Sequence, residues 1–302
     1  MELSLTSPLL HAGGRRLLSL LGQLPDGIAR LDLDAVFQPG GARAAANLRQ
    51  LGLAFGDETG RLRVLAPIRE YVAAGHPPAA EDLGRAVGHY CALLAKEGDA
   101  VGTAGGAEAA EIVAAETGNL TRLIGVAVEQ GRWAEVADAA WGLGEYMRFT
   151  GADLPGLWDH ILRRVHDSAT PLQQAKILFA AGALALDRSD HEGARVRFEE
   201  ALALYRRVGS VLGAANCIQG LGDIVLGRSD HEGAGARFEK ALALFRQIAE
   251  PYSTGMAHRR LARLASGSER RTHVAAAREA WLSIDRPDLV ADLDEEFGPA
   301  AE

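Results

Sequence analysis

Residues Arg188-Ser-Asp-His-Glu-Gly-Ala194 recur without change as Arg228-Ser-Asp-His-Glu-Gly-Ala234, at an offset of 40 residues. The similarity continues from Arg197-Phe-Glu-Glu-Ala-Leu-Ala-Leu-Tyr205 to Arg237-Phe-Glu-Lys-Ala-Leu-Ala-Leu-Phe245. A fixed period of this size is the sequence signature of stacked structural units. Each such unit buries its apolar face against its neighbours. The chain is therefore predicted to contain a repeat array.

Each unit contains two helical patterns joined by a turn. The first helix is predicted at residues 173–187 and again at 213–227, and the second helix at 191–208 and 231–248. A helix, a turn and a second helix form an αα-hairpin. The repeat array is therefore predicted to be mainly α, built from stacked αα-hairpins.

The second helices carry a stripe in which small residues alternate with large rings. The stripe occupies positions i, i+4, i+7 and i+11 of each helix, namely Ala194, Phe198, Ala201 and Tyr205, then Ala234, Phe238, Ala241 and Phe245. On the first helices, Gly182 and Gly222 stand twelve residues before each stripe. Small residues let neighbouring helices approach while phenylalanine fills the gap, so both phenylalanines are predicted to be core residues. This spacing resembles the tetratricopeptide repeat, here lengthened to 40 residues.

A third unit is indicated by helical patterns at residues 252–265 and 273–284, followed by a last helix near 289–297. Its glycine position holds Ala262, and divergent end units are expected as caps of a repeat array. The resemblance implies that residues 169–302 form tetratricopeptide repeats with a C-terminal capping helix.

Residues 79–168 are predicted to be a helical linker with degenerate repeat-like helices. Helical periodicity is visible at 133–148 and at 154–166. Trp141 and Trp158 are the expected packing anchors of these helices.

Residues 1–78 have a different pattern. Three short helices, a hairpin and a further helix are predicted at residues 15–24, 31–37 and 43–53, then 53–55 with 61–65, then 67–72. Three helices followed by a hairpin make a winged helix. The predicted architecture is thus an N-terminal winged-helix domain followed by the helical linker and the repeat solenoid.

Four stretches, Arg16–Ile28, Leu48–Phe55, Arg61–Tyr71 and Glu116–Leu120, together with the repeats, resemble the C-terminal part of bacterial STAND regulators, the NB-ARC-like signalling ATPases. In those proteins a nucleotide-binding domain precedes the winged helix. The resemblance implies a module that senses a signal and transmits it to an upstream or separate ATPase domain.

The composition and the lysine positions restrict the function. The chain has 302 residues, 48% hydrophobic and 24% charged, with a formal net charge of −8, which is typical of a folded protein and opposes general nucleic-acid or membrane binding. A P-loop needs glycine, lysine and then serine or threonine, but Ala95, Ala175 and Glu239 precede the lysines. We therefore expect no catalytic site and no nucleotide cofactor.

Cys91 and Cys217 lie far apart, each within an apolar helical pattern, and are predicted to be buried free thiols. Free thiols suit a reducing cytosol, and Met1–Leu10 lacks the basic start of an export signal. A cytoplasmic location is expected.

The motif Ser189-Asp-His191-Glu192 and its copy at 229–232 place a hydroxyl, a carboxylate and an imidazole together. Adjacent residues at a helix start point in different directions, which argues against a catalytic or metal site. Ser-x-x-Glu is the pattern of a capping box, in which serine accepts a hydrogen bond from a free backbone N–H. Ser189 and Ser229 are therefore predicted to be helix caps.

The winged helix raises an alternative, a DNA-binding transcriptional regulator that uses the repeats as its sensor. Residues 1–78 hold eight arginines against seven acidic residues, so the local charge gives this alternative little support. The third helix offers four side chains to phosphates or bases, Arg43, Asn47, Arg49 and Gln50.

The repeat groove is the preferred candidate site. In tetratricopeptide stacks the first helix of each unit faces the concave side, and three positions around each small residue point into it. These are Lys176, Phe179 and Ala183, then Asn216, Gln219 and Asp223, then Met256, Arg259 and Arg263. Amides, an acid and bases in one groove suit an extended peptide, whose acidic end would meet the arginines.

The sequence thus predicts a non-catalytic protein-interaction and signal-sensing module. Its expected partners are a protein or peptide ligand in the groove and an ATPase domain. A truncated gene product without a separate role is a third interpretation.

Overall fold

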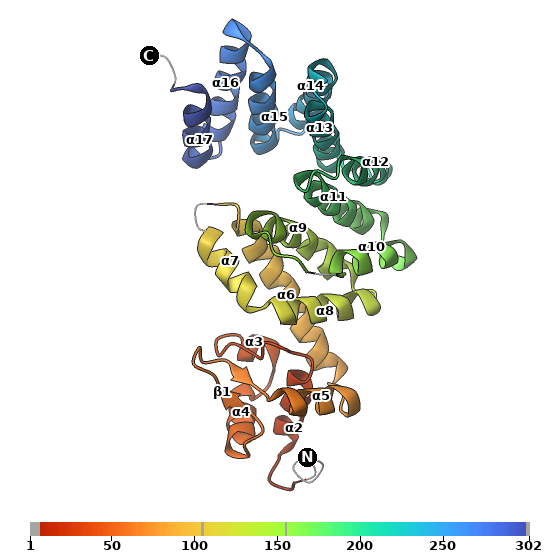
Figure 1. Cartoon of the computed structure of the whole chain (residues 1–302), viewed down its shortest axis with the longest axis vertical. Coiled ribbons are helices and arrows are strands. Elements are labelled where there is room, and N and C mark those ends of the chain that lie inside the picture. Colours follow the sequence, from red (N-terminus) through yellow and green to blue (C-terminus); the bar gives the residue numbers. More distant parts are fainter. Residues whose placement is uncertain (1–6, 104–105, 155, 300–302) are drawn as a thin grey trace. The chain divides into compact units, whose positions relative to one another are not determined.

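The computed structural model describes residues 7–103, 106–154 and 156–299. The chain is mostly helical and divides into two compact units, Met1–Ala169 and Thr170–Glu302 (Figure 1). The prediction of a mainly α fold with a helical-hairpin solenoid is confirmed.

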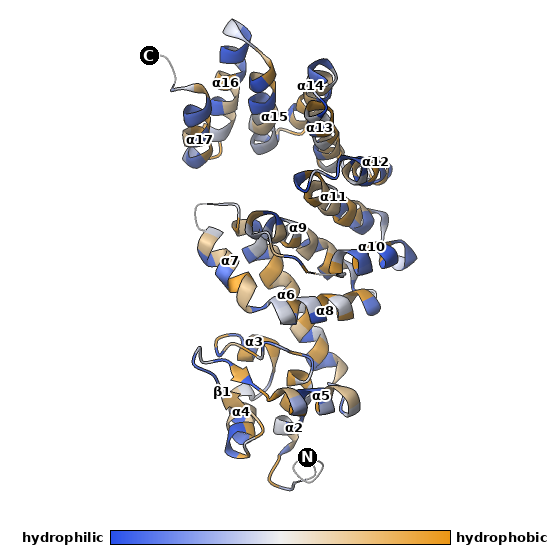
Figure 2. Cartoon of the chain, in the orientation of Figure 1, coloured by the Kyte–Doolittle hydropathy of each residue, from blue (hydrophilic) through white to orange (hydrophobic). Residues whose placement is uncertain are grey.

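The second unit consists of three antiparallel helix pairs and a final helix. The pairs are α11 (Pro171–Asp187) with α12 (His191–Arg207), α13 (Val211–Gly227) with α14 (His231–Gln247), and α15 (Pro251–Leu264) with α16 (Gly267–Leu282), and α17 (Pro287–Phe297) follows them. Each second helix also packs against the first helix of the following pair. Hydrophobic residues dominate α13, whereas hydrophilic residues are frequent on α14 (Figure 2).

The two predicted core phenylalanines are buried, with Phe198 2% and Phe238 0% exposed. The spacing between glycine and phenylalanine, which is the same in both pairs, has a steric reason. A methyl group built on Gly182 would lie 2.9 Å from the ring of Phe198, and one on Gly222 would lie 2.6 Å from the ring of Phe238. The absence of a side chain at each glycine therefore makes room for the ring.

The third pair uses a different large residue. Trp281 is fully buried, its indole nitrogen donates a hydrogen bond of 3.1 Å to the carbonyl of Tyr252, and its ring lies against Gly255. The second helix begins at Gly267 and not at the predicted residue 273. The early turns of α16 are polar and exposed, so apolar periodicity does not reveal them.

The predicted serine caps are wrong. Ser189 and Ser229 both adopt a left-handed backbone with φ of 62°, in the turn between the two helices of a pair. The caps are the next residues, Asp190 and Asp230, whose carboxylates accept from the N–H groups of Gly193 at 2.9 Å and Gly233 at 2.8 Å. Aspartate caps a helix as well as serine does, so the motif is a cap displaced by one residue.

From residue 7 on, the described part of the first unit has the predicted order of three helices and a hairpin. Its elements are α2 (Ala12–Leu21), α3 (Leu33–Val36), α4 (Gly41–Gln50), β1 (Phe55–Gly56), β2 (Leu62–Arg63) and α5 (Ala66–Gly75). The strands are antiparallel, with Phe55 opposite Arg63 and Gly56 opposite Leu62. Ile28 adds an antiparallel bridge to Leu62. This is the element order of a winged helix.

Among the described residues, five more helices belong to the first unit. They are α6 (Ala80–Ala100), α7 (Gly106–Ala115), α8 (Thr117–Glu129), α9 (Trp133–Thr150) and α10 (Leu157–Ser168). Trp133 is 3% exposed and donates to the hydroxyl of Ser168 at 2.8 Å, whereas Trp141 is 37% exposed. The buried anchor of α9 is therefore Trp133, whereas Trp141 is partly exposed and its indole nitrogen donates to Asp99 of α6 at 3.0 Å.

Both cysteines are buried free thiols, as predicted. Burial raises the pKa of Cys91 and of Cys217 to about 12, so neither thiol is a nucleophile near neutral pH. Across the described ranges, no helix combines the length and the apolar character that a bilayer crossing requires.

Candidate functional site on the first helices of the repeats

The predicted groove residues lie on α11, α13 and α15, the first helices of the three pairs. Lys176 and Arg263 are exposed, and Asn216, Gln219 and Asp223 are half-buried. Hydrogen bonds join α13 to α15 and α15 to α17, so side chains on these helices meet across the inner surface of the second unit.

Phe179 contributes to packing as well as to the surface. Its ring centroid lies 5.7 Å from that of Phe198, and it packs against the core cluster formed by Ala185, Ala194, Phe198 and Ile224. A half-buried ring fixed by its neighbours offers a rigid apolar contact to a ligand.

The side-chain carbonyl of Gln219 is shielded from solvent, and no donor among the described residues reaches it. Leaving a buried acceptor unpaired costs about 1–3 kcal/mol. A ligand that brings an N–H group to this oxygen removes that cost. Asn216, one helical turn earlier on the same face of α13, supplies a second amide.

Asp223 is already paired within the second unit. It accepts hydrogen bonds of 2.8, 3.1 and 2.9 Å from Arg260 on α15, in a bidentate arrangement. Arg260 was not among the predicted site residues. Its position two residues before Ala262, on the side that faces the preceding first helix, is the signal that would have identified it.

Arg259 and Arg263 share one carboxylate of the chain itself. Arg259 donates to Glu296 of α17 at 2.6 Å, and Arg263 donates to the same group at 3.0 Å through its terminal nitrogen. The hydrogen bond from Arg263, with that from Arg259, lowers the pKa of Glu296 although partial burial opposes the shift. An internal acid therefore occupies the place that the sequence assigned to the acidic end of a ligand.

The candidate groove thus has two ends of different character. At α11 and α13 lie a fixed ring, two half-buried amide side chains and the shielded, unpaired carbonyl of Gln219. At α15, the arginines are bonded to Glu296 and Asp223. The amide end keeps an unpaired acceptor, whereas at the charged end Glu296 already pairs with Arg259 and Arg263.

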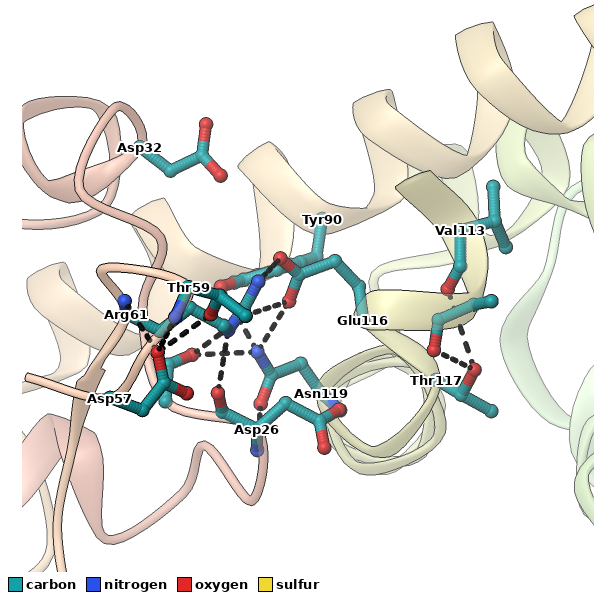
Figure 3. A network of polar contacts seen from close by, with 12 residues as sticks. Asp26, Asp32, Asp57, Thr59, Arg61, Tyr90, Val113, Glu116, Thr117 and Asn119 are labelled. Carbon is teal, nitrogen blue, oxygen red and sulfur yellow. Dashed lines mark hydrogen bonds and ion pairs between the residues drawn. The ribbon is translucent and has the colours of Figure 1, made fainter. Parts of the chain in front are cut away.

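The first unit holds a buried polar network (Figure 3). Arg61, next to β2, makes a bidentate ion pair with Glu116 at 2.6 and 2.7 Å, and Asn119 donates to Glu116 at 2.7 Å and to the hydroxyl of Tyr90 at 3.1 Å. Asp26 is joined to Asn119 by two backbone-to-side-chain bonds of 3.0 and 2.9 Å. Because these groups satisfy one another, the network fixes the hairpin to α8.

Of the four side chains predicted for DNA contact, three are exposed and one is hydrogen-bonded within the chain. Arg43, Arg49 and Gln50 are exposed on α4. Asn47 instead accepts from the backbone of His11 at 3.2 Å and donates to that of Leu9 at 3.0 Å. Nowhere in the described part of the chain do three potential metal ligands gather.

Comparison with known proteins identifies the repeats. The tetratricopeptide repeat family model matches residues 173–247, the first two pairs. The chain is also similar to the crystal structure of a Signal Transduction ATPase with Numerous Domains (STAND) protein with a tetratricopeptide repeat sensor from Pyrococcus horikoshii, at 14% identity and a TM-score of 0.44. That alignment covers 94% of this chain and 53% of the other, so the chain spans about half its length. No curated protein matches the chain.

Proposed function

We propose that the chain is a non-catalytic protein-interaction and signal-sensing module that binds a protein or peptide ligand through its repeats. Tetratricopeptide repeats are a protein-interaction fold, and the family match covers both helix pairs that carry the amide end of the groove. The observation that supports this proposal best is the shielded, unsatisfied carbonyl of Gln219 beside Phe179 and Asn216. An extended peptide supplies the N–H donors that this surface lacks.

We further propose that the module is the winged-helix and repeat part of a STAND-type regulator. Residues 1–78 would be the winged-helix domain, 79–168 the helical linker and 169–302 the repeats. The sequence resemblance in Arg16–Ile28, Leu48–Phe55 and Arg61–Tyr71 supports this assignment. Its partner in signalling would be an upstream or separate ATPase domain.

In the proposed ligand site, Phe179, Asn216 and Gln219 contact the ligand, and Lys176 borders it on α11. Asp223, Arg259 and Arg263 continue the groove, where a ligand acid competes with Glu296 for the guanidinium groups. The ligand is therefore expected to be a peptide segment that offers backbone donors and carries an acidic end.

Site-specific photocrosslinking tests this function. A photoreactive benzoylphenylalanine at Asn216 in the full chain is expected to form a discrete adduct with a protein partner in a lysate of the source cells. The matched control carries the same group at Glu239, an exposed residue of the second helix α14. Equal adducts at both positions, or an adduct at Glu239 alone, would contradict binding on the inner face.

A further inference from the structure

The side chains of Arg246, His258 and His273 form a continuous chain of hydrogen bonds that connects α14, α15 and α16. Arg246 of α14 lies 2.9 Å from Nε2 of His258 on α15, and Nδ1 of His258 lies 2.9 Å from Nδ1 of His273 on α16. His258 is buried, with 4% of its surface exposed, and the two imidazole rings lie 5.2 Å apart at 43°. These contacts link the three consecutive helices α14, α15 and α16.

The chemistry of the donors fixes where the protons lie. A guanidinium group can only donate, so Nε2 of His258 must accept from Arg246. A neutral imidazole with an accepting Nε2 carries its proton on Nδ1, which then donates to Nδ1 of His273. His273 consequently holds its own proton on Nε2. Both hydrogen bonds exist together only while both histidines are neutral.

Adding a proton breaks this chain at one of two places. A proton on Nε2 of His258 sets an N–H against the guanidinium of Arg246, and a proton on Nδ1 of His273 sets an N–H against that of His258. The first event also brings a second positive charge next to Arg246. Burial, together with the charges of Arg246 and His273, lowers the pKa of His258 to about 4.

No described acidic group near His258 offsets the positive charge that protonation of this ring would create. The charged or titratable groups that face His258 from the packed helices are Arg246 on α14 and His273 on α16. The acids near α15 are engaged elsewhere, since Glu250 accepts from the backbone N–H of Ser253 and Glu296 binds Arg259 and Arg263. Asp223 is likewise held by Arg260.

We propose that Arg246, His258 and His273 form an acid-sensitive latch that holds α14, α15 and α16 together at neutral pH and opens more often as the pH falls. The ligand of this site is the proton. Because α15 also carries Arg259 and Arg263, opening changes the charged end of the groove. The role of the latch in signal sensing rests on the proposed function, whereas the latch itself does not.

The direction of the pH dependence follows from linkage. The pKa of His258 is lowered from 6.5 to about 4 in the folded chain, so the unfolded state binds more protons between these two values. The stabilisation by the neutral histidine is complete above about pH 6.5 and is lost as the pH falls towards 4. One displaced proton changes the opening equilibrium about tenfold per pH unit within this window.

Nitrogen-15 NMR of the full chain at pH 7.5 tests the arrangement directly. His258 is expected as the tautomer with the proton on Nδ1, with His273 protonated on Nε2, and His258 is expected to stay neutral through pH 5.5. A proton on Nε2 of His258, or titration of this ring near pH 6.5, would overturn the proposal.

Hydrogen exchange of backbone amides measures the opening. After correction for intrinsic exchange rates, opening of segment 251–282 is expected to increase about tenfold or more between pH 7.5 and 5.5, while segment 171–227 changes little. In His258→Gln, whose side-chain amide can accept from Arg246 and donate to His273 without a titrating group, the increase is expected to shrink. The control His76→Asn, at an exposed histidine, is expected to behave as wild type.

Equal pH dependence of the two segments, or of wild type and His258→Gln, would refute the latch. These measurements use no partner, so their failure leaves the proposed interaction function untouched. Failure of photocrosslinking at Asn216 at neutral pH would contradict the proposed interaction function but not the latch proposal.

Discussion

Replacing Phe238 by alanine is expected to lower the free energy of unfolding of the second unit by about 3–5 kcal/mol. The ring is fully buried between α13 and α14, and its removal leaves a cavity next to Gly222, which has no side chain to fill it. Phe198→Ala is expected to have a comparable effect, because the two stripes are copies. Urea unfolding followed by circular dichroism provides the measurement.

Val196→Ala is the matched control for these two variants. Val196 lies on α12 but is 48% exposed, so its truncation is expected to change the free energy of unfolding by less than about 0.5 kcal/mol. If Phe238→Ala unfolded at the same urea concentration as wild type, the assignment of this ring to the core would be wrong.

Replacing Arg61 by alanine is expected to destabilise the first unit by about 3–5 kcal/mol, because the change leaves Glu116 buried without its cation. Glu116→Ala is expected to have a similar effect for the converse reason. Thermal unfolding followed by circular dichroism measures both. The control is Arg195→Ala on the exposed surface of α12, where the pairs to Glu192 and Glu199 are expected to contribute less than about 1 kcal/mol.

The double variant Arg61→Met/Glu116→Leu separates the ion pair from the unpaired charge. Because it removes both charges and keeps apolar volume, it is expected to be more stable than either single alanine variant. If the single variants melted like wild type, the network would not hold the hairpin against α8.

Much of the fold could be predicted because the repeat occurs in two nearly identical copies. The identical motif at 188–194 and 228–234 fixes the period, and the alternation of alanine with Phe198 and Phe238 fixes the buried face of the second helices. Helix termini were harder, since a cap depends on backbone angles. The left-handed conformation of Ser189 passes the capping role to Asp190, one residue further on.

One helix cap that follows the sequence rule is absent from the sequence predictions above. Thr170 and Gln173 form a reciprocal capping box at the start of α11, with bonds of 3.4 and 2.8 Å between side chains and backbone. The pattern Thr-x-x-Gln directly before an apolar run would have revealed it. The same rule is wrong at Ser189 because it takes no account of the left-handed turn at this residue, which makes Asp190 the cap.

The candidate site was only partly accessible from sequence. The spacing from Gly182 and Gly222 places Phe179, Asn216 and Gln219 on the first helices, but sequence distance does not show which charges meet. Glu296 lies 37 residues beyond Arg259 and reaches it only because α17 packs next to the third pair. The histidine latch was missed for the same reason, since His258 and His273 belong to different helices.

The central claim is that a ligand binds at the amide end of the inner face, on α11 and α13. The most direct measurement is the affinity, by isothermal titration calorimetry, of the full chain for the partner captured at Asn216. Asn216→Ala/Gln219→Ala is expected to weaken binding more than tenfold without lowering the melting temperature, while Glu239→Ala/Lys240→Ala on the exposed surface of α14 binds as wild type. Equal affinity of wild type and Asn216→Ala/Gln219→Ala would contradict the claim.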